Sequence, residues 1–421
     1  MKKPELLLPA GSTERLKSAI LYGADAVYAG LPGFSLRSTE NAEIDFSDIK
    51  ANVEYVHAHG KKIYLTLNLF AKDKEFENLP KLLDIVKEIK PDGLLIADPG
   101  VFHFVKEYGI ETPLFVSTQA NVCSSHSVKF WQKMGASLCV MARELSYDDI
   151  KIIRQECPDM KLEMFVHGAM CISYSGRCLI SAFMANRSAN RGKCAHSCRW
   201  HYKAHLIEDE RADETYVMEE DEHGSYLMNS KDMNLMPFIE KVLDLELDTL
   251  KIEGRNKSEF YVSTVARAYR QAIDNYMNNG KDFDTTPYLE ELNTLHNRSY
   301  TDGFFNGAPN QNAQKYEHTR SSSDYLYAGF IKEVKEDGFV FFVKNKLFKN
   351  DEITFLCPKS LKNVILCLKT IRITGKKQND DAMEVSPSPQ GSEIFIKYSD
   401  FNEDVKELLP ELSVARKVRN Y

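Results

Sequence analysis

The stretch PELLLPAGSTERLKSAILYGADAVYAG, residues 4–30, decides the fold class of this chain. Its apolar runs at residues 5–9 and 26–30 are short and continuous, which is typical of strands buried in a parallel sheet. The segment between them carries a helical pattern from Thr13 to Tyr22. The stretch therefore predicts a strand, a helix and a second strand, the repeating unit of α/β proteins.

The same alternation continues through the first 275 residues. Six further strands are predicted at residues 63–68, 93–98, 114–119, 138–143, 162–167 and 249–253. Eight strands alternating with helices predict the α/β class and a (β/α)8 TIM-like barrel. A doubly wound open sheet is the alternative, but it gives no reason for the count to reach eight, and no G-x-G-x-x-G phosphate turn occurs.

The chain is predicted to have three parts. The barrel spans residues 1–277 and carries a Cys-rich insertion at 181–248 before its last strand. A helical connection follows at 278–320. Residues 321–421 favour alternating strands with turns between them, which predicts a small C-terminal antiparallel β-barrel domain. Such an appendage more often docks a large partner than performs catalysis.

Composition and charge narrow the class of protein. The chain has 421 residues, of which 43% are hydrophobic and 27% charged, as in soluble globular proteins. A net charge of −7 argues against binding nucleic acid with the whole surface, but not against a local basic patch. No run reaches membrane-spanning length, and the apolar run in MKKPELLLPAGS is too short for a secretory core. We expect a cytoplasmic protein with no membrane partner.

Four cysteines, Cys171, Cys178, Cys194 and Cys198, follow the spacing C-x6-C-x15-C-x3-C. In a chain without a secretory signal, such clustered thiols favour a metal centre over disulfides, because the cytosol keeps thiols reduced. The spacing lacks the C-x2-C pairs of zinc ribbons. A [4Fe–4S] cluster is therefore the favoured hypothesis, with zinc or unligated thiols as the alternatives.

Polar residues stand where the predicted strands end. In a barrel these ends meet at one mouth, which is where barrel active sites lie. Candidate substrate-binding residues there are Asn68, Asp98, Gln119, Arg143, Glu253 and Arg255. Glu144 and His167 are candidate proton-transfer groups. For Asn68 and Asp98, an ordinary loop or helix-capping role is the alternative.

A basic stretch interleaved with aromatic rings follows the first cysteines. Such a mixture can neutralise phosphates and stack bases, so it is a candidate RNA-binding segment. A polar shell around the metal site is the alternative. Its candidate residues are Arg187, Arg191, Lys193, Arg199 and Trp200.

The residues around the first two cysteines form a family signature. The chain satisfies every fixed position of E-x-F-x-x-G-[AS]-x-C-x(4)-G-x-C-x-x-S between Glu163 and Ser181. It thereby resembles the U32 family, once named for peptidase or collagenase activity. Further matching stretches, among them LKIEGRNKSEFY at residues 250–261, extend the resemblance over nearly the whole chain.

The resemblance is strongest to a branch of this family that hydroxylates wobble uridine 34 of tRNA to 5-hydroxyuridine. It implies an iron–sulfur cluster and a requirement for prephenate, a small dicarboxylate. Cys171, Cys178 and Cys194 align with cluster cysteines, and Cys198 is the expected fourth ligand because no cysteine follows until Cys357. The dicarboxylate would need guanidinium groups, and the arginines nearest the predicted mouth are Arg37, Arg143, Arg177 and Arg255.

The main hypothesis is therefore an enzyme whose C-terminal domain and basic stretch hold the tRNA anticodon arm while a uridine enters the mouth. A U32-type peptidase and a noncatalytic metal-stabilised scaffold are the alternatives. The peptidase hypothesis has little support, because the sequence contains neither the H-E-x-x-H motif of zinc proteases nor the G-x-S-x-G motif of serine hydrolases. A helper protein and the oligomeric state are left open.

Overall fold

The computed structural model describes residues 2–31, 33–35, 46–171, 173, 178–187, 194–199, 205–207, 215–217, 230–280, 284–307, 323–373, 383–384 and 388–419. Eight parallel strands close into a barrel, because the last strand pairs with both the first and the seventh. The (β/α)8 prediction is confirmed. The strands are β1 (Glu5–Pro9), β2 (Ala26–Gly30), β3 (Lys62–Leu67), β4 (Gly93–Ile96), β5 (Leu114–Val116), β6 (Leu138–Val140), β7 (Lys161–Ala169) and β11 (Thr249–Ile252).

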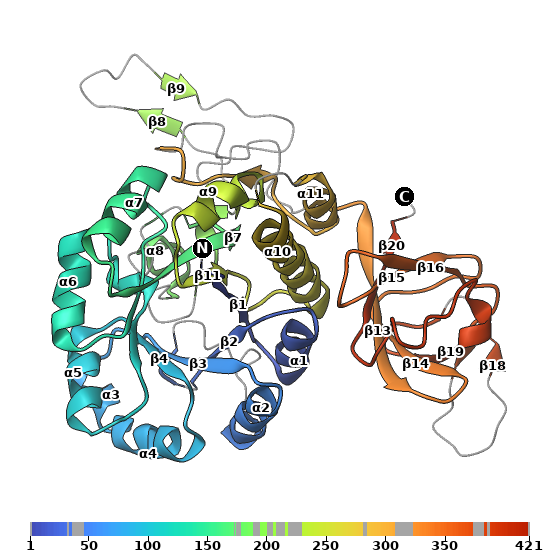
Figure 1. Ribbon diagram of the computed structural model, residues 1–421, viewed down its shortest axis with the longest axis horizontal. Helices are drawn as coiled ribbons and strands as arrows, with labels where there is room; N and C mark the ends of the chain where they lie inside the picture. The colour runs from blue at the N-terminus through green and yellow to red at the C-terminus, as the bar shows by residue number, and fades with distance from the viewer. Residues whose placement is uncertain are drawn as a thin grey trace.

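A ring of helices surrounds the barrel (Figure 1). Their apolar faces cover the strands, and most begin with a residue that caps the free N–H groups, as Ser12 does for the first helix. None of the helices described is both long enough and apolar enough to cross a membrane. The ring comprises α1 (Thr13–Leu21), α2 (Phe46–Ala58), α3 (Asp73–Phe76), α4 (Leu79–Ile89), α5 (Pro99–Glu107), α6 (Ser125–Met134), α7 (Tyr147–Glu156), α9 (Ile239–Asp244) and α10 (Glu259–Asn279).

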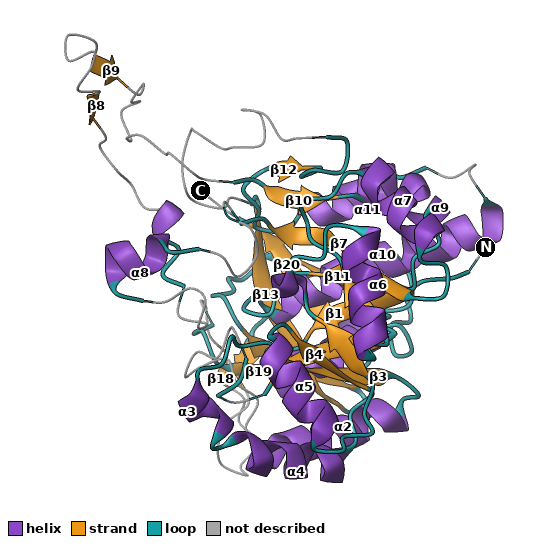
Figure 2. Ribbon diagram, turned by 90° about the vertical axis from the view of Figure 1, so that its left-hand side faces the viewer, coloured by secondary structure: helices purple, strands orange, loops and turns teal. Residues whose placement is uncertain are grey.

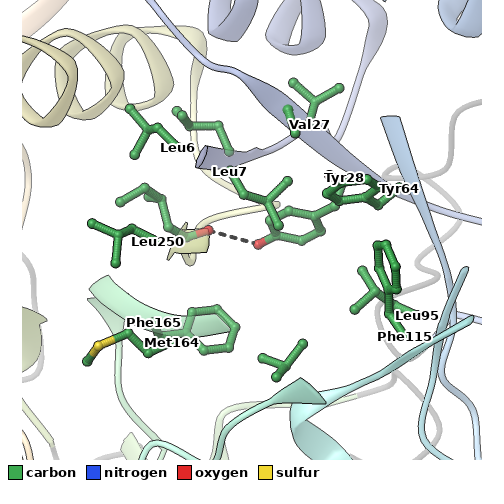
Figure 3. Packing of buried hydrophobic residues seen from close by; sticks show 14 of the residues in the cluster. Leu6, Leu7, Val27, Tyr28, Tyr64, Leu95, Phe115, Met164, Phe165 and Leu250 are labelled. Atoms are coloured by element: carbon green, nitrogen blue, oxygen red, sulfur yellow. Dashed lines mark hydrogen bonds between the residues drawn. The ribbon is translucent and has the colours of Figure 1, made fainter. Parts of the chain in front are cut away.

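Side chains alternate between the inside of the barrel and the surrounding helices. Leu7, Tyr28 and Phe165 gather inside the barrel, whereas Val27 and Leu250 point away from it (Figure 3). This alternation follows from the two-residue period of a strand. The Tyr28 hydroxyl donates to the Ile252 carbonyl at 3.0 Å, so even the polar atom of this interior ring is bonded.

Several further elements join or extend the barrel. Figure 2 shows α8 (Ile180–Ala185) on the side opposite the N-terminus. β10 (Asp232–Asn234) pairs antiparallel with β7 and parallel with β12 (Tyr300–Thr301). β8 (His205–Ile207) and β9 (Thr215–Val217) form a separate antiparallel pair. α11 (Thr286–Asn293) packs on α10 and leads towards the last part of the chain.

The C-terminal residues form a curled antiparallel sheet, as the sequence predicts, around an aromatic core of its own. Its order is β16-β15-β20-β13-β14-β19-β17-β18. The chain divisions at residues 277 and 320 stay predictions. The strands are β13 (Tyr325–Val334), β14 (Gly338–Val343), β15 (Glu352–Leu356), β16 (Asn363–Cys367), β17 (Arg372–Ile373), β18 (Met383–Glu384), β19 (Glu393–Lys397) and β20 (Val414–Val418).

Buried polar groups fasten this sheet to the barrel. Arg267 of α10 is fully buried and lies 2.6 Å from the Glu291 carboxylate of α11, which Arg416 of β20 also contacts at 2.9 Å. At the end of α1 the Tyr22 hydroxyl donates to the Leu356 carbonyl at 2.8 Å and accepts from the Val414 N–H at 2.9 Å. Because buried polar groups are costly to leave unpaired, these bonds fix how the two parts sit.

The Tyr22 hydroxyl provides a test of this attachment. Tyr22→Phe should lower the free energy of unfolding by about 1–3 kcal/mol, because it leaves buried backbone groups unpaired. Tyr398→Phe is the matched control, since that hydroxyl makes no hydrogen bond within the described part of the chain. Urea unfolding of both variants measures the difference. Equal stabilities for the two variants would contradict the role given to Tyr22.

Candidate active site

A cavity of about 50 Å³ opens at the carboxyl end of the barrel. Its lining comes from four of the eight strands, β2, β3, β7 and β11, and from the loops that follow β3, β5, β6 and β11. That volume has room for a few water molecules, or for one acidic group of a ligand. The lining residues are Tyr28, Thr66, Asn68, Ser117, Thr118, Gln119, Arg143, Phe165, Lys251, Glu253 and Arg255. The structure thus brings together five of the predicted mouth residues, Asn68, Gln119, Arg143, Glu253 and Arg255.

Two arginines of the cavity are held by the barrel itself. Arg255 is buried, and its Nη1 donates to the Ser35 hydroxyl at 2.8 Å and to the Thr66 hydroxyl at 3.2 Å. Arg143 donates to the Ala169 carbonyl at 2.8 Å, and its guanidinium lies 5.0 Å from the centre of the Phe165 ring. Both guanidinium groups are therefore positioned before any ligand arrives.

Lys251 is a third cation in the lining, and it sits at the centre of the barrel. Its ammonium lies 2.7 Å from Glu163 Oε1 and 4.5 Å from the centre of the Tyr28 ring. Burial raises the pKa of the Glu163 carboxyl, and the Lys251 charge opposes that rise. The pair is almost wholly buried, with side-chain exposures of 6% and 0%.

Amide and hydroxyl groups line another part of the cavity. The Asn68 side-chain N–H donates to Gln119 Oε1 at 3.1 Å, and the Ser117 hydroxyl donates to the same oxygen. Among the lining side chains, the positive ones, Arg143, Lys251 and Arg255, outnumber the one carboxylate, Glu253. This arrangement suits a small anion that also accepts hydrogen bonds, such as a carboxylate.

Asp98 does not line the cavity, and the structure shows the helix-capping role that was its alternative, so substrate binding by Asp98 stays a prediction. Its carboxylate accepts hydrogen bonds from the N–H groups of Gly100 and Val101 at 2.7 and 3.1 Å and caps α5. Pro99 starts that helix directly after the strand, so the carboxylate turns to the helix end. Glu144 follows β6, is half-buried and also lies outside the lining. Burial is the main cause that raises the pKa of the Cys123 thiol, and the negative charge of Glu144 adds to that rise.

His167 lies behind the barrel wall and not among the residues that line the mouth. The register between β7 and β11 shifts between Lys251 and Ile252, so that Phe165 and His167 pair with consecutive residues. The His167 ring contacts Tyr261 and Tyr269 of α10 and Tyr300 of β12. Strict alternation along β7 would turn the His167 side chain into the mouth, and this irregularity turns it outward instead.

The four clustered cysteines lie on the connection that follows β7. Cys171 and Cys194 are exposed, and Cys178 and Cys198 are half-buried. The Ala195 N–H donates to the Ser181 hydroxyl at 2.8 Å and ties the two halves of this connection together. Four thiols are the donor set that a soft metal centre requires. Within the described residues, no three cysteine, histidine or acidic side chains are grouped as a metal site.

Several predicted site residues fall outside the described residues: Arg37, Arg177, Arg191, Lys193 and Trp200. Arg187 is described and exposed after α8, while for Arg199 only the backbone is described. The proposed RNA-binding role of this basic stretch therefore stays a prediction.

Sequence reasoning missed Lys251, Thr66 and Ser117. A signal for Lys251 existed, because a lysine inside the apolar strand TLKI and a glutamate inside the strand that pairs with it must meet once the barrel closes. No comparable signal marked the two hydroxyl residues, which read as ordinary strand residues.

The sequence of this chain is similar to those of several known proteins. Residues 11–315 match the model of the family described as Peptidase family U32. The chain is 38% identical over 405 residues to tRNA hydroxylation protein P of Escherichia coli K12, covering 87% of this chain and 89% of that protein.

Two further relatives carry other names. Similarity to a collagenase of Porphyromonas gingivalis W83 is 32% identity over 72% of this chain and 73% of the relative. Similarity to the 23S rRNA 5-hydroxycytidine C2501 synthase of Escherichia coli K12 is 36% identity over 64% of this chain and 39% of the relative.

The His167 environment generates a prediction about pH. Burial lowers the pKa of His167 from 6.5 to about 4, although the Asp232 charge and the Asn234 side chain oppose the shift. Between these two values the unfolded chain binds the proton and the folded chain does not, so stability should fall as the pH drops from 6.5 to 4. NMR titration, with His167→Gln to assign the signal, should show a neutral ring at pH 5. A midpoint near 6.5 would contradict this.

Proposed function

This chain belongs to peptidase family U32, and from that membership we propose that it is a tRNA-modifying enzyme that hydroxylates carbon 5 of uridine 34 in the anticodon. One observation carries the proposal, namely the 38% identity to tRNA hydroxylation protein P across 87% of this chain and 89% of the relative. The relative named for 5-hydroxycytidine synthesis supports the same class of reaction on a pyrimidine. The proposal implies a cytoplasmic location.

The mouth cavity supplies the binding part of this proposal. Arg143, Lys251 and Arg255 surround a space suited to a carboxylate, so we propose that a small dicarboxylate, prephenate by family resemblance, binds there. The Asn68 and Gln119 amides would orient its remaining oxygens. Replacing the hydrogen on carbon 5 by a hydroxyl adds one oxygen atom and removes two electrons from the base, so the reaction also needs an oxygen donor and a two-electron acceptor.

The cysteine segment supplies the metal part. We propose that Cys171, Cys178, Cys194 and Cys198 hold a [4Fe–4S] cluster, with zinc as the alternative metal. The donor set fits, and α8, which lies between Cys178 and Cys194 in the sequence, stands on the side of the barrel opposite the N-terminus (Figure 2). A bound cluster would supply one-electron transfer.

Proteolysis is the less supported candidate, although one relative is named a collagenase. A protease nucleophile needs a neighbouring base. Among the described residues that line the cavity there is neither a cysteine nor a histidine, and the Ser117 hydroxyl donates to an amide oxygen instead.

Nucleoside mass spectrometry of tRNA tests the function. A strain lacking the gene should lose 5-hydroxyuridine and its derivatives at position 34. Wild type should restore them, Cys171→Ser should not, and Cys367→Ser, an exposed cysteine of the C-terminal sheet, should restore them as its control. Anaerobically purified wild type and Cys367→Ser should hold about four irons and four sulfides per chain, and Cys171→Ser fewer. Unchanged tRNA, in a strain with no second enzyme for this modification, would contradict the proposal.

Calorimetric titration with prephenate tests the anion site. Arg255→Gln and Arg143→Gln should each weaken binding about 10- to 100-fold, because each removes charge-assisted hydrogen bonds worth about 1.5–3 kcal/mol. Arg372→Gln, an exposed arginine of β17, is the matched control and should bind like wild type. Equal affinities for all three variants would place the dicarboxylate elsewhere.

A further inference from the structure

The loop between β14 and β15 has an unusual composition for this acidic chain. Residues 344–349 read KNKLFK, with three lysines, one phenylalanine and no acidic residue. Phe348 is 45% exposed, and Lys346 and Lys349 are also exposed. An exposed ring among cations is the combination that single-stranded nucleic acid recognition requires, because rings stack on bases and cations bind phosphates.

The backbone of this loop is fixed on the sheet. The Lys344 N–H donates to the Ala328 carbonyl at 2.9 Å, and the Asn345 side chain donates to the Tyr327 carbonyl at 2.8 Å. Leu347 is fully buried, and its N–H donates to the Ser388 hydroxyl at 3.2 Å. Because Leu347 is anchored in the core, the Phe348 ring is held at the surface, and ordering it on binding costs little further conformational entropy.

One carboxylate beside the loop, that of Asp351, is already paired with a cation outside the loop. Asp351 accepts a hydrogen bond from the Phe348 N–H at 2.9 Å, but its charge is balanced by Lys417 at 2.6 Å in a buried pair. The Lys417 ammonium also lies 5.2 Å from the centre of the Phe348 ring. Lys346 and Lys349 of the loop are thus exposed on either side of the ring, whereas Lys344 faces the Glu259 carboxylate.

A series of contacts leads from this loop to the mouth of the barrel. Lys344 lies 3.8 Å from the Glu259 carboxylate at the start of α10, and Arg15 lies 3.6 Å from the same carboxylate. Arg15 in turn donates to the Arg255 carbonyl at 3.2 Å, and the Arg255 side chain lines the cavity. The start of the loop, at Lys344, thus lies near the carboxyl ends of the barrel strands.

We propose that the loop at residues 344–349 is an RNA-binding site, where Phe348 stacks on an unpaired base close to the target uridine and the lysines bind the adjoining phosphates. The occupant is the single-stranded loop of the tRNA substrate. An acidic peptide would satisfy the lysines but not the exposed ring. This inference rests on the proposed function and adds a contact to it.

Fluorescence anisotropy with a labelled transcript of the tRNA tests the site on the full-length protein. Phe348→Ala should weaken binding about tenfold, in the range for loss of one stacked base, and should leave the salt dependence unchanged. Phe348→Trp keeps a stacking ring and should bind like wild type. The double variant Lys346→Ala/Lys349→Ala should weaken binding and lower the slope of log affinity against log salt by between about one and two.

Matched controls come from the same domain. Ile365→Ala removes an apolar side chain of β16 that is 56% exposed, against 45% for Phe348, and Lys335→Ala removes an exposed lysine just before β14, at its opposite end. Both should bind within about twofold of wild type. If Phe348→Ala and the double lysine variant bind like these controls while wild type binds and modifies tRNA, the loop site is overturned. The proposed function then still stands. Wild type that neither binds nor modifies tRNA would overturn both.

Discussion

The structure depends on the closure of the barrel, and a buried ion pair spans the two strands that close it. Glu163 on β7 and Lys251 on β11 meet at 2.7 Å with almost no exposure. Removing either partner would leave a buried charge uncompensated, which is strongly destabilising. Because parallel strands in a closed barrel all end at one face, closure brings Arg143 and Arg255 to the same cavity although they are 112 positions apart in the sequence. The mouth therefore follows from the pairing of β7 with β11.

Closure also decides where the C-terminal sheet stands. α10 follows the closing strand directly, so its first residue, Glu259, lies beside the mouth while Arg267, two turns later, enters the interface with the sheet. Arg267 donates to backbone carbonyls of that sheet and to the Asn363 side chain at 2.8 Å. One helix thus sets the position of both the cavity and the neighbouring domain, and a surface on the sheet keeps a fixed distance from the mouth.

The sequence predicted what periodicity controls and missed what depends on local geometry. Eight apolar runs were enough for the barrel, because buried strands need them and the count admits few other folds. The direction of side chains at strand ends was less certain. An irregularity between β7 and β11 takes His167 away from the mouth, and a following helix start turns Asp98 into a cap. Lys251 was missed because an apolar strand was read only as a strand. For the cysteines, the sequence identifies thiols as the candidate metal donors, but their spacing alone does not determine whether the four thiols meet at one point.

The net charge of −7 limits how this chain can hold an RNA. An acidic surface repels phosphates in general, so attraction must come from local sites at the mouth and beside it. A double-stranded RNA would offer phosphates to the loop at residues 344–349, but its stacked bases could neither cover Phe348 nor enter the barrel. A single-stranded loop offers both, since its bases can be splayed apart. The loop at residues 344–349 and the cationic mouth are joined through Glu259 and Arg15. On the proposed function, the enzyme would select an anticodon loop because that loop can place one base on Phe348 and another in the mouth.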